Sequence, residues 1–111
     1  MTQKLVRVAI PVPLAQSFDY LWPLPDPLPA PGTRVKVPFG RSHHIGVVVE
    51  HPASSPIDAH RLKAATQALD DRPLIDPQLL ALLNWASDYY RHPLGEVIAA
   101  ALPKALRQGK P

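Results

Sequence analysis

A single carboxylate interrupts the most aromatic stretch of the chain. Asp19 lies between Phe18 and Tyr20, in a short apolar run with the composition of a β-strand, where a carboxylate is disfavoured. Because side chains alternate between the two faces of a strand, Asp19 can point to solvent while its neighbours pack. Alternatively, the carboxylate binds a ligand, since an ionised Asp only accepts hydrogen bonds. The pattern alone leaves both interpretations open.

The other reactive residue types do not form a catalytic or metal-binding pattern. His43 and His44 are adjacent, which is a poor arrangement for sharing a metal ion, and we interpret them as two half-exposed loop histidines. Nothing orients an imidazole toward Ser42 for nucleophilic catalysis. We interpret Asp70 and Asp71 as a solvated turn. Phosphate-binding glycine motifs of the GxxxxGKS/T or GxGxxG kind are absent from the sequence.

The composition indicates one cytoplasmic domain. With 111 residues the chain can bury a single core, and without cysteine it has neither disulfides nor thiolate zinc sites. Its 15 prolines are dispersed and leave room for few long helices. No segment has the pattern of a signal peptide or a membrane span, so we expect no membrane partner. The net charge of +3 permits nucleic-acid binding without requiring it.

Alternating apolar residues in the first half predict four β-strands. They cover residues 5–12, 18–22, 33–37 and 45–50. In the third, Val35 and Val37 should point inward, and Arg34 and Lys36 outward. Short connections between such strands favour a small antiparallel sheet or a partly closed barrel.

Proline and glycine mark the connections. Five prolines between residues 23 and 32 predict an extended loop. Pro38-Phe39-Gly40 predicts a turn in which Gly40 takes a positive φ. Gly46, inside the last strand, predicts a bulge or a close backbone approach. Residues 62–69 fit a helix by propensity and a strand by alternation, and the pattern does not decide between them.

The second half predicts two helices. Asp76 has the position of an N-cap before Pro77, and the first helix should break at His92-Pro93. The second should cover Leu94 to Leu102 and end at Pro103. An apolar stripe on the first helix predicts its core-facing side: Leu79, Leu82, Leu83, Ala86, Tyr89 and Tyr90, with Trp85, Tyr89 and Tyr90 expected in the core. Strands followed by helices give an α+β fold.

Several short motifs occur in a fixed order along the chain. In the first half they are PVPL (11–14), FDY (18–20), GTRVKVPFGR (32–41) and IGVV (45–48). In the second half they are LK (62–63), LD (69–70), WA (85–86), DYY (88–90), HPLGEV (92–97) and ALP (101–103). Their joint order resembles the N-terminal domain of the PriA family of replication-restart helicases, over nearly the whole chain.

This resemblance implies a module that recognises the 3′ end of a DNA strand, such as the nascent leading strand at a stalled fork. It implies a pocket formed by Phe18, Asp19, Tyr20, Phe39, Gly40 and Lys63, and a strand over residues 62–69. In the family, a helicase motor with ATP, Mg²⁺ and zinc sites follows this domain. We therefore expect a non-catalytic DNA-binding domain over residues 1–105, without a cofactor, and the start of a linker over 106–111.

The residue types suit such a pocket. Asp19 can accept a hydrogen bond from an amino or imino group of an unpaired terminal base, and the Gly40 main chain can approach a base edge. The three aromatic side chains can wall or stack on the base, which contributes about 1–3 kcal/mol per base in other systems. Lys63 can neutralise a phosphate. The expected partner is forked or single-stranded DNA with a free 3′ end.

A protein-interaction module is the alternative from a different class. It would dock primosome proteins or single-strand-binding protein through the β half of the domain. Replacement of Asp19 by Ala distinguishes the two hypotheses. If the domain binds DNA ends, the substitution should abolish the preference for an end, whereas a protein-interaction module should keep its partner binding. A hydrolase fragment would need a residue cluster that the sequence lacks. We expect a nucleoid-associated monomer.

Overall fold

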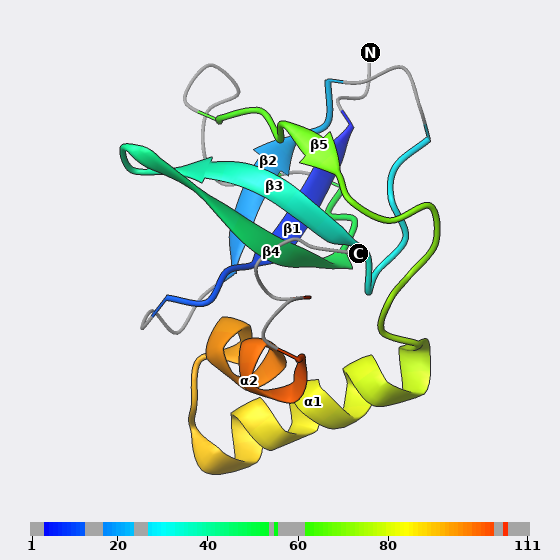
Figure 1. The fold of residues 1–111 in the computed structure, drawn as a ribbon, viewed down its shortest axis with the longest axis vertical. Coiled ribbons are helices and arrows are strands. Elements are labelled where there is room, and N and C mark those ends of the chain that lie inside the picture. Colours follow the sequence, from blue (N-terminus) through cyan, green and yellow to red (C-terminus); the bar gives the residue numbers. More distant parts are fainter. Residues whose placement is uncertain are drawn as a thin grey trace.

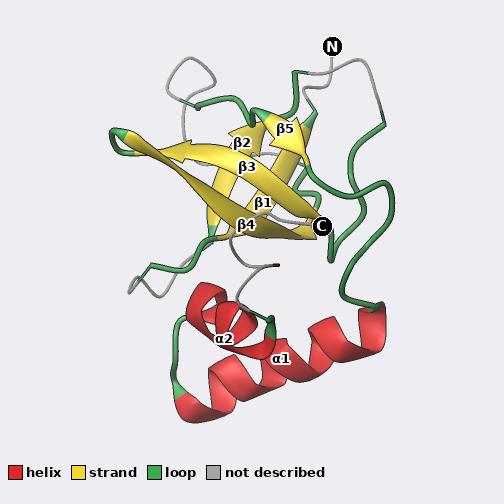
Figure 2. Ribbon diagram, viewed as in Figure 1, coloured by secondary structure: helices red, strands yellow, loops and turns green. Residues whose placement is uncertain are grey.

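The computed structural model describes residues 4–12, 17–23, 27–53, 55, 62–103 and 106. A sheet is followed by two helices, which lie together at one end of the molecule (Figure 1 and Figure 2). The elements in chain order are β1 (Leu5–Ala9), β2 (Phe18–Leu21), β3 (Arg34–Phe39), β4 (Ser42–Glu50), β5 (Gln67–Ala68), α1 (Pro77–Tyr90) and α2 (Leu94–Ala101). The α+β prediction is confirmed.

The sheet has the strand order β2-β1-β4-β3-β5, with antiparallel neighbours, and it does not close into a barrel. An isolated parallel bridge nevertheless joins Leu21 at the end of β2 to Ala64, before β5. The Leu21 amide donates to the Lys63 carbonyl, and the Ala65 amide donates to the Leu21 carbonyl, each over 2.9 Å. The segment before β5 therefore lies against the opposite edge of the sheet.

One face of the sheet holds the first core. Val6 and Val8 of β1, Val35 and Val37 of β3, and Val48 of β4 are each 0% exposed, so the inward orientation predicted for Val35 and Val37 is confirmed. The Cβ of a larger residue at Gly46 would lie 2.8 Å from the Ala9 carbonyl oxygen, so the predicted close backbone approach is confirmed.

A second core lies between the sheet and the helices. Ala9 and Val47 contribute the sheet side, and Leu83 of α1 and Ile98 of α2 pack on them. The predicted N-cap is confirmed, because Asp76 Oδ1 accepts from the Leu79 amide over 2.7 Å. No helix that the structure describes is long and apolar enough to cross a membrane.

The prediction that the aromatic residues of α1 lie in the core is wrong. Trp85, Tyr89 and Tyr90 are 56%, 66% and 67% exposed, whereas Leu80 and Leu83 are the buried residues of this helix. Apolar residues surround α1 on most of its circumference, so periodicity cannot identify the face that packs on the sheet.

Arg34 and Asp70 also differ from the prediction. Arg34 is 3% exposed although it points away from the first core, and it donates from Nε and Nη2 to the Asp70 carboxylate over 3.0 and 2.7 Å. Its Nη1 donates to the Leu106 carbonyl over 2.7 Å. Asp70 is therefore not part of a solvated turn, whereas Asp71 is exposed. The hydrogen bond from Arg34 holds the pKa of Asp70 below its usual value.

The β3–β4 hairpin turns two residues later than predicted. Phe39 pairs with Ser42, so the turn consists of Gly40 and Arg41, and Gly40 has the expected positive φ of 61°. His43 and His44 consequently lie in β4 rather than in a loop. Two-residue hairpin loops with glycine first match the twist of the flanking strands, which explains this register.

Residues 62–69 form a strand only at Gln67–Ala68, which pair with β3. The longer strand implied by the family resemblance is therefore confirmed only in part. Within the predicted proline-rich loop, residues 27–30 have no regular structure, and residues 24–26 lie outside the described residues. The domain boundary at residue 105 and the linker beyond Leu106 lie outside them as well.

Candidate nucleic-acid interface

The six residues predicted to form a pocket meet around one hollow. They come from β2, from the β3–β4 hairpin and from the segment before β5, and the hollow has a volume of about 220 Å³. Its lining residues are Phe18, Asp19, Tyr20, Pro38, Phe39, Gly40, Leu62 and Lys63. Pro38 and Leu62 were not predicted as site residues; each directly precedes one that was.

Three tertiary contacts bring these segments together. The main-chain bonds of Leu21 hold Lys63 beside β2. The Tyr20 hydroxyl donates to the Pro38 carbonyl over 2.8 Å and ties β2 to the end of β3. Lys63 Nζ lies 3.5 Å from the Gly40 carbonyl oxygen, so the cation is at the rim beside the hairpin turn.

The aromatic residues divide into support and exposed wall. Tyr20 is only 4% exposed and belongs to the first core, and burial raises its pKa to about 12. Phe18 and Phe39 are half-buried and pack edge-to-face, with ring centroids 5.1 Å apart and an interplanar angle of 67°. His44 packs edge-on against Phe39 at 5.6 Å. Phe18 and Phe39 are therefore the rings that a ligand can reach.

Asp19 does not simply point to solvent, as one interpretation of the sequence had it. Its side chain is 7% exposed, and Oδ1 accepts a hydrogen bond from Arg7 Nε over 2.8 Å. Arg7 also pairs through Nη1 with Glu50 on β4. The hydrogen bond to Asp19 raises the pKa of Arg7, which stays fully charged. Sequence reasoning missed Arg7, although it is the one charged residue of β1.

Position 40 favours glycine because of its backbone conformation, not because a side chain there would clash. Its φ of 61° is in the left-handed region, and a Cβ added there meets no atom within 4 Å. The turn is exposed, so its peptide groups are accessible from the hollow and from solvent. This arrangement offers main-chain hydrogen-bonding groups next to the Phe39 ring.

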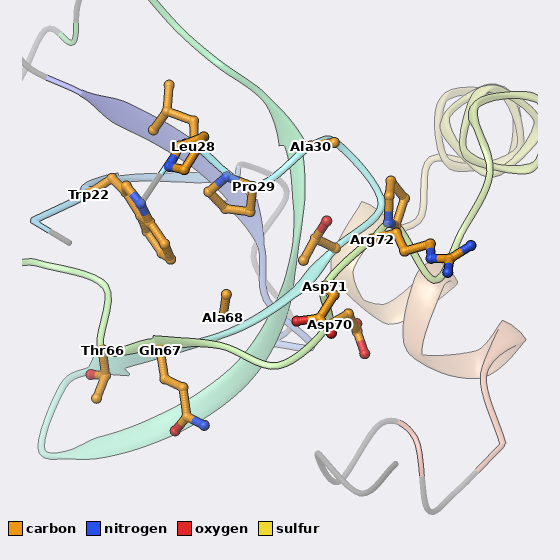
Figure 3. A pocket seen from close by; sticks show the side chains of 13 residues that line it. Trp22, Leu28, Pro29, Ala30, Thr66, Gln67, Ala68, Asp70, Asp71 and Arg72 are labelled. Atoms are coloured by element: carbon orange, nitrogen blue, oxygen red, sulfur yellow. The ribbon is translucent and has the colours of Figure 1, made fainter. Parts of the chain in front are cut away.

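A larger hollow, of about 620 Å³, is lined by a different set of residues (Figure 3). Trp22, Leu28 and Pro29 face Gln67 and Ala68 across it, and the acidic residues at 70 and 71 lie at one end. It shares no lining residue with the smaller hollow. Within the described part of the chain, no group of three His, Asp or Glu side chains could hold a metal ion.

Comparisons with known proteins place the chain in a family. Residues 7–103 match the family described as the PriA 3′ DNA-binding domain (3′BD). The replication restart protein PriA of Haemophilus influenzae is 43% identical over 108 residues, which cover 96% of this chain and 14% of that protein. PriA of Buchnera aphidicola from Acyrthosiphon pisum is 32% identical over 92% of the chain, and that of Treponema pallidum 32% over 69%.

The chain thus spans about 14% of the length of the first curated relatives that it matches. The family match extends from β1 to the end of α2 and includes every residue that lines the smaller hollow. This chain belongs to the family of PriA 3′ DNA-binding domains.

Proposed function

We propose that this domain binds DNA at the 3′ end of a strand, with the terminal base in the smaller hollow. The observation that carries the proposal is the meeting of an acceptor, two accessible aromatic rings and a cation, from three separate segments, around this hollow. The family to which the chain belongs binds 3′ DNA by its description, which supports the same ligand.

Each accessible group has a distinct task in this proposal. Asp19 accepts a hydrogen bond from the edge of the unpaired base, and the exposed peptide groups at Gly40 supply a second contact. Phe18 and Phe39 pack on the base, while Tyr20 supports them from the core. Lys63, at the rim, neutralises a phosphate and gives affinity without sequence preference.

Selection of an end rather than a continuous strand is steric. The volume of about 220 Å³ is below the roughly 300–1,000 Å³ of pockets for drug-sized ligands, which suits a single terminal base. In this proposal, Phe39 and Gly40 lie where a strand continuing beyond the terminal sugar would run, and they block it. A free 3′ end therefore fits, and an internal nucleotide does not.

In the full-length protein we propose that this non-catalytic domain positions a helicase motor. Binding of the arrested leading-strand end at a stalled fork would fix the fork relative to the motor and to the primosome proteins that assemble there. The relatives named replication restart proteins are about seven times longer than the segment they share with this chain, which leaves room for such a motor.

The test is fluorescence anisotropy with short single-stranded oligonucleotides that differ only in a free 3′-hydroxyl or a 3′-phosphate. We expect tighter binding to the free hydroxyl and loss of this preference in Asp19→Ala. The matched control is Asp71→Ala, which removes an exposed carboxylate outside the smaller hollow. Equal binding of the wild type to both oligonucleotides would refute the proposal and favour the protein-interaction alternative.

A further inference from the structure

Arg7 lies behind the carboxylate to which the proposed function assigns the terminal base. On β1 it is opposite Asp19 of β2 on one side and opposite Glu50 of β4 on the other. Its Nε donates to Asp19 Oδ1, and its Nη1 pairs with Glu50. Three side chains of alternating charge therefore form a row across three strands, and the guanidinium is held from both ends.

We propose, on the basis of the proposed function, that Arg7 makes the pocket tolerant of all four bases by occupying one of the two acceptor oxygens of Asp19. Oδ1 is engaged by Arg7, and none of the described residues donates to Oδ2. Asp19 lines the smaller hollow, and no buried side-chain oxygen of the described residues is without a partner, so Oδ2 is not closed off from solvent. Asp19 thus offers a base one oxygen, Oδ2, that no described residue engages.

One acceptor can be satisfied by any unpaired DNA base. Adenine and cytosine carry an amino group on the pairing edge, thymine carries an imino group, and guanine carries both. Two adjacent carboxylate oxygens are matched only by the neighbouring N1–H and N2–H of guanine, as a bidentate pair. An Asp19 with both oxygens free would therefore select guanine by about fivefold or more, the low end for a bidentate base contact.

Arg7 is a positioning residue in this proposal, and two substitutions isolate its hydrogen bond. In Arg7→Gln, the side-chain amide nitrogen is as many bonds from Cα as the Arg Nε, so a donor to Oδ1 can persist. Arg7→Met has the same length without a donor. Both variants remove the positive charge and the contact with Glu50, so any difference between them reports on the donor alone.

The experiment measures the Kd of four single-stranded oligonucleotides, with free 3′-hydroxyls, that differ only in a terminal dA, dC, dG or dT. We expect the wild type and Arg7→Gln to bind all four within about threefold, and Arg7→Met to bind the dG end about fivefold or more tightly than the others. Near-ultraviolet circular dichroism verifies the fold, and Arg7→Leu replaces Arg7→Met if the latter does not fold.

Three results would overturn this role of Arg7. In the first, the wild type itself binds the dG end about fivefold more tightly than the others. In the second, the Gln and Met variants show the same change in Kd for each end. In the third, the Met variant loses affinity equally for all four ends. The comparison of 3′-hydroxyl and 3′-phosphate ends is made on the same wild-type protein. If the wild type distinguishes the ends while the Met variant stays tolerant, only the role of Arg7 fails and the proposed function stands.

Discussion

Asp70, in a stretch with the composition of a turn, holds two distant parts of the chain together. Its carboxylate accepts from the Arg34 side chain and from the Arg34 amide, so it fixes the start of β3 to the segment between β5 and α1. The Arg34 side chain is 3% exposed and that of Asp70 is 15% exposed. Removal of either partner leaves a buried group without its counterpart, which is costly.

The pH dependence of stability should report this pair. Because the folded protein holds the pKa of Asp70 below 3.8, its contribution to stability is complete above about pH 5 and is lost as the pH falls through the lowered value. Asp70→Asn should reduce the free energy of unfolding at pH 7 by about 3 kcal/mol and flatten its decline below pH 4. Urea unfolding at several pH values measures both.

Asp71→Asn is the control, because Asp71 is exposed beside Asp70. It should change the free energy of unfolding at pH 7 by less than about 0.5 kcal/mol. Equal effects of the two substitutions would show that the Arg34–Asp70 pair does not stabilise the fold.

At the scale of elements, α1 has two apolar faces, one of which faces solvent. Leu80 and Leu83 pack toward the second core, while Leu82 is 57% exposed on the same side as Trp85 and Tyr89. The Trp85 and Tyr89 rings stack with centroids 5.0 Å apart. This is an (i, i+4) pair on a helix surface, so its contribution to stability is small.

Substitutions in α1 should therefore affect stability according to face rather than residue size. Leu83→Ala should lower the free energy of unfolding by about 2–4 kcal/mol, because it removes buried methyl groups from the second core. Trp85→Ala, although it removes a larger side chain, should cost less than about 1 kcal/mol. Thermal denaturation of both variants measures the two losses of stability. A larger loss for Trp85→Ala than for Leu83→Ala would mean that the Trp85 ring is buried in solution.

At the scale of the whole molecule, the charge distribution limits the mode of DNA binding. The net charge is +3, and Lys63 is the one cation that lines the smaller hollow. A domain that binds one terminal nucleotide touches few phosphates, in contrast to a protein that tracks a long strand. Its affinity should consequently depend only weakly on salt.

The slope of log Kobs against log salt concentration on a single strand should be about −2 or shallower, as expected for two or three phosphate contacts. Titrations between low and moderate NaCl measure it with the 3′-hydroxyl oligonucleotide used above. A slope steeper than about −4, typical of six or more contacts, would contradict binding through one pocket.

The sequence alone predicted the local structure. Alternation identified the inward valines of β3, Asp76 and Pro77 fixed the start of α1, and the order of short motifs led to the family. These features depend on neighbours in the chain. The six pocket residues were likewise named from the motifs, and their role in binding stays a prediction.

Only the tertiary structure decided which side chains meet. The bonds of Leu21 to Lys63 and Ala65, the pairing of Arg34 with Asp70 and the engagement of Asp19 by Arg7 all join residues far apart in sequence. A charged residue on a strand is compatible with solvent or with a buried partner, and periodicity is the same in both cases. Whether such a residue meets solvent or a partner depends on the element that covers its face of the sheet. That element is distant in sequence, so the local pattern holds no information about it.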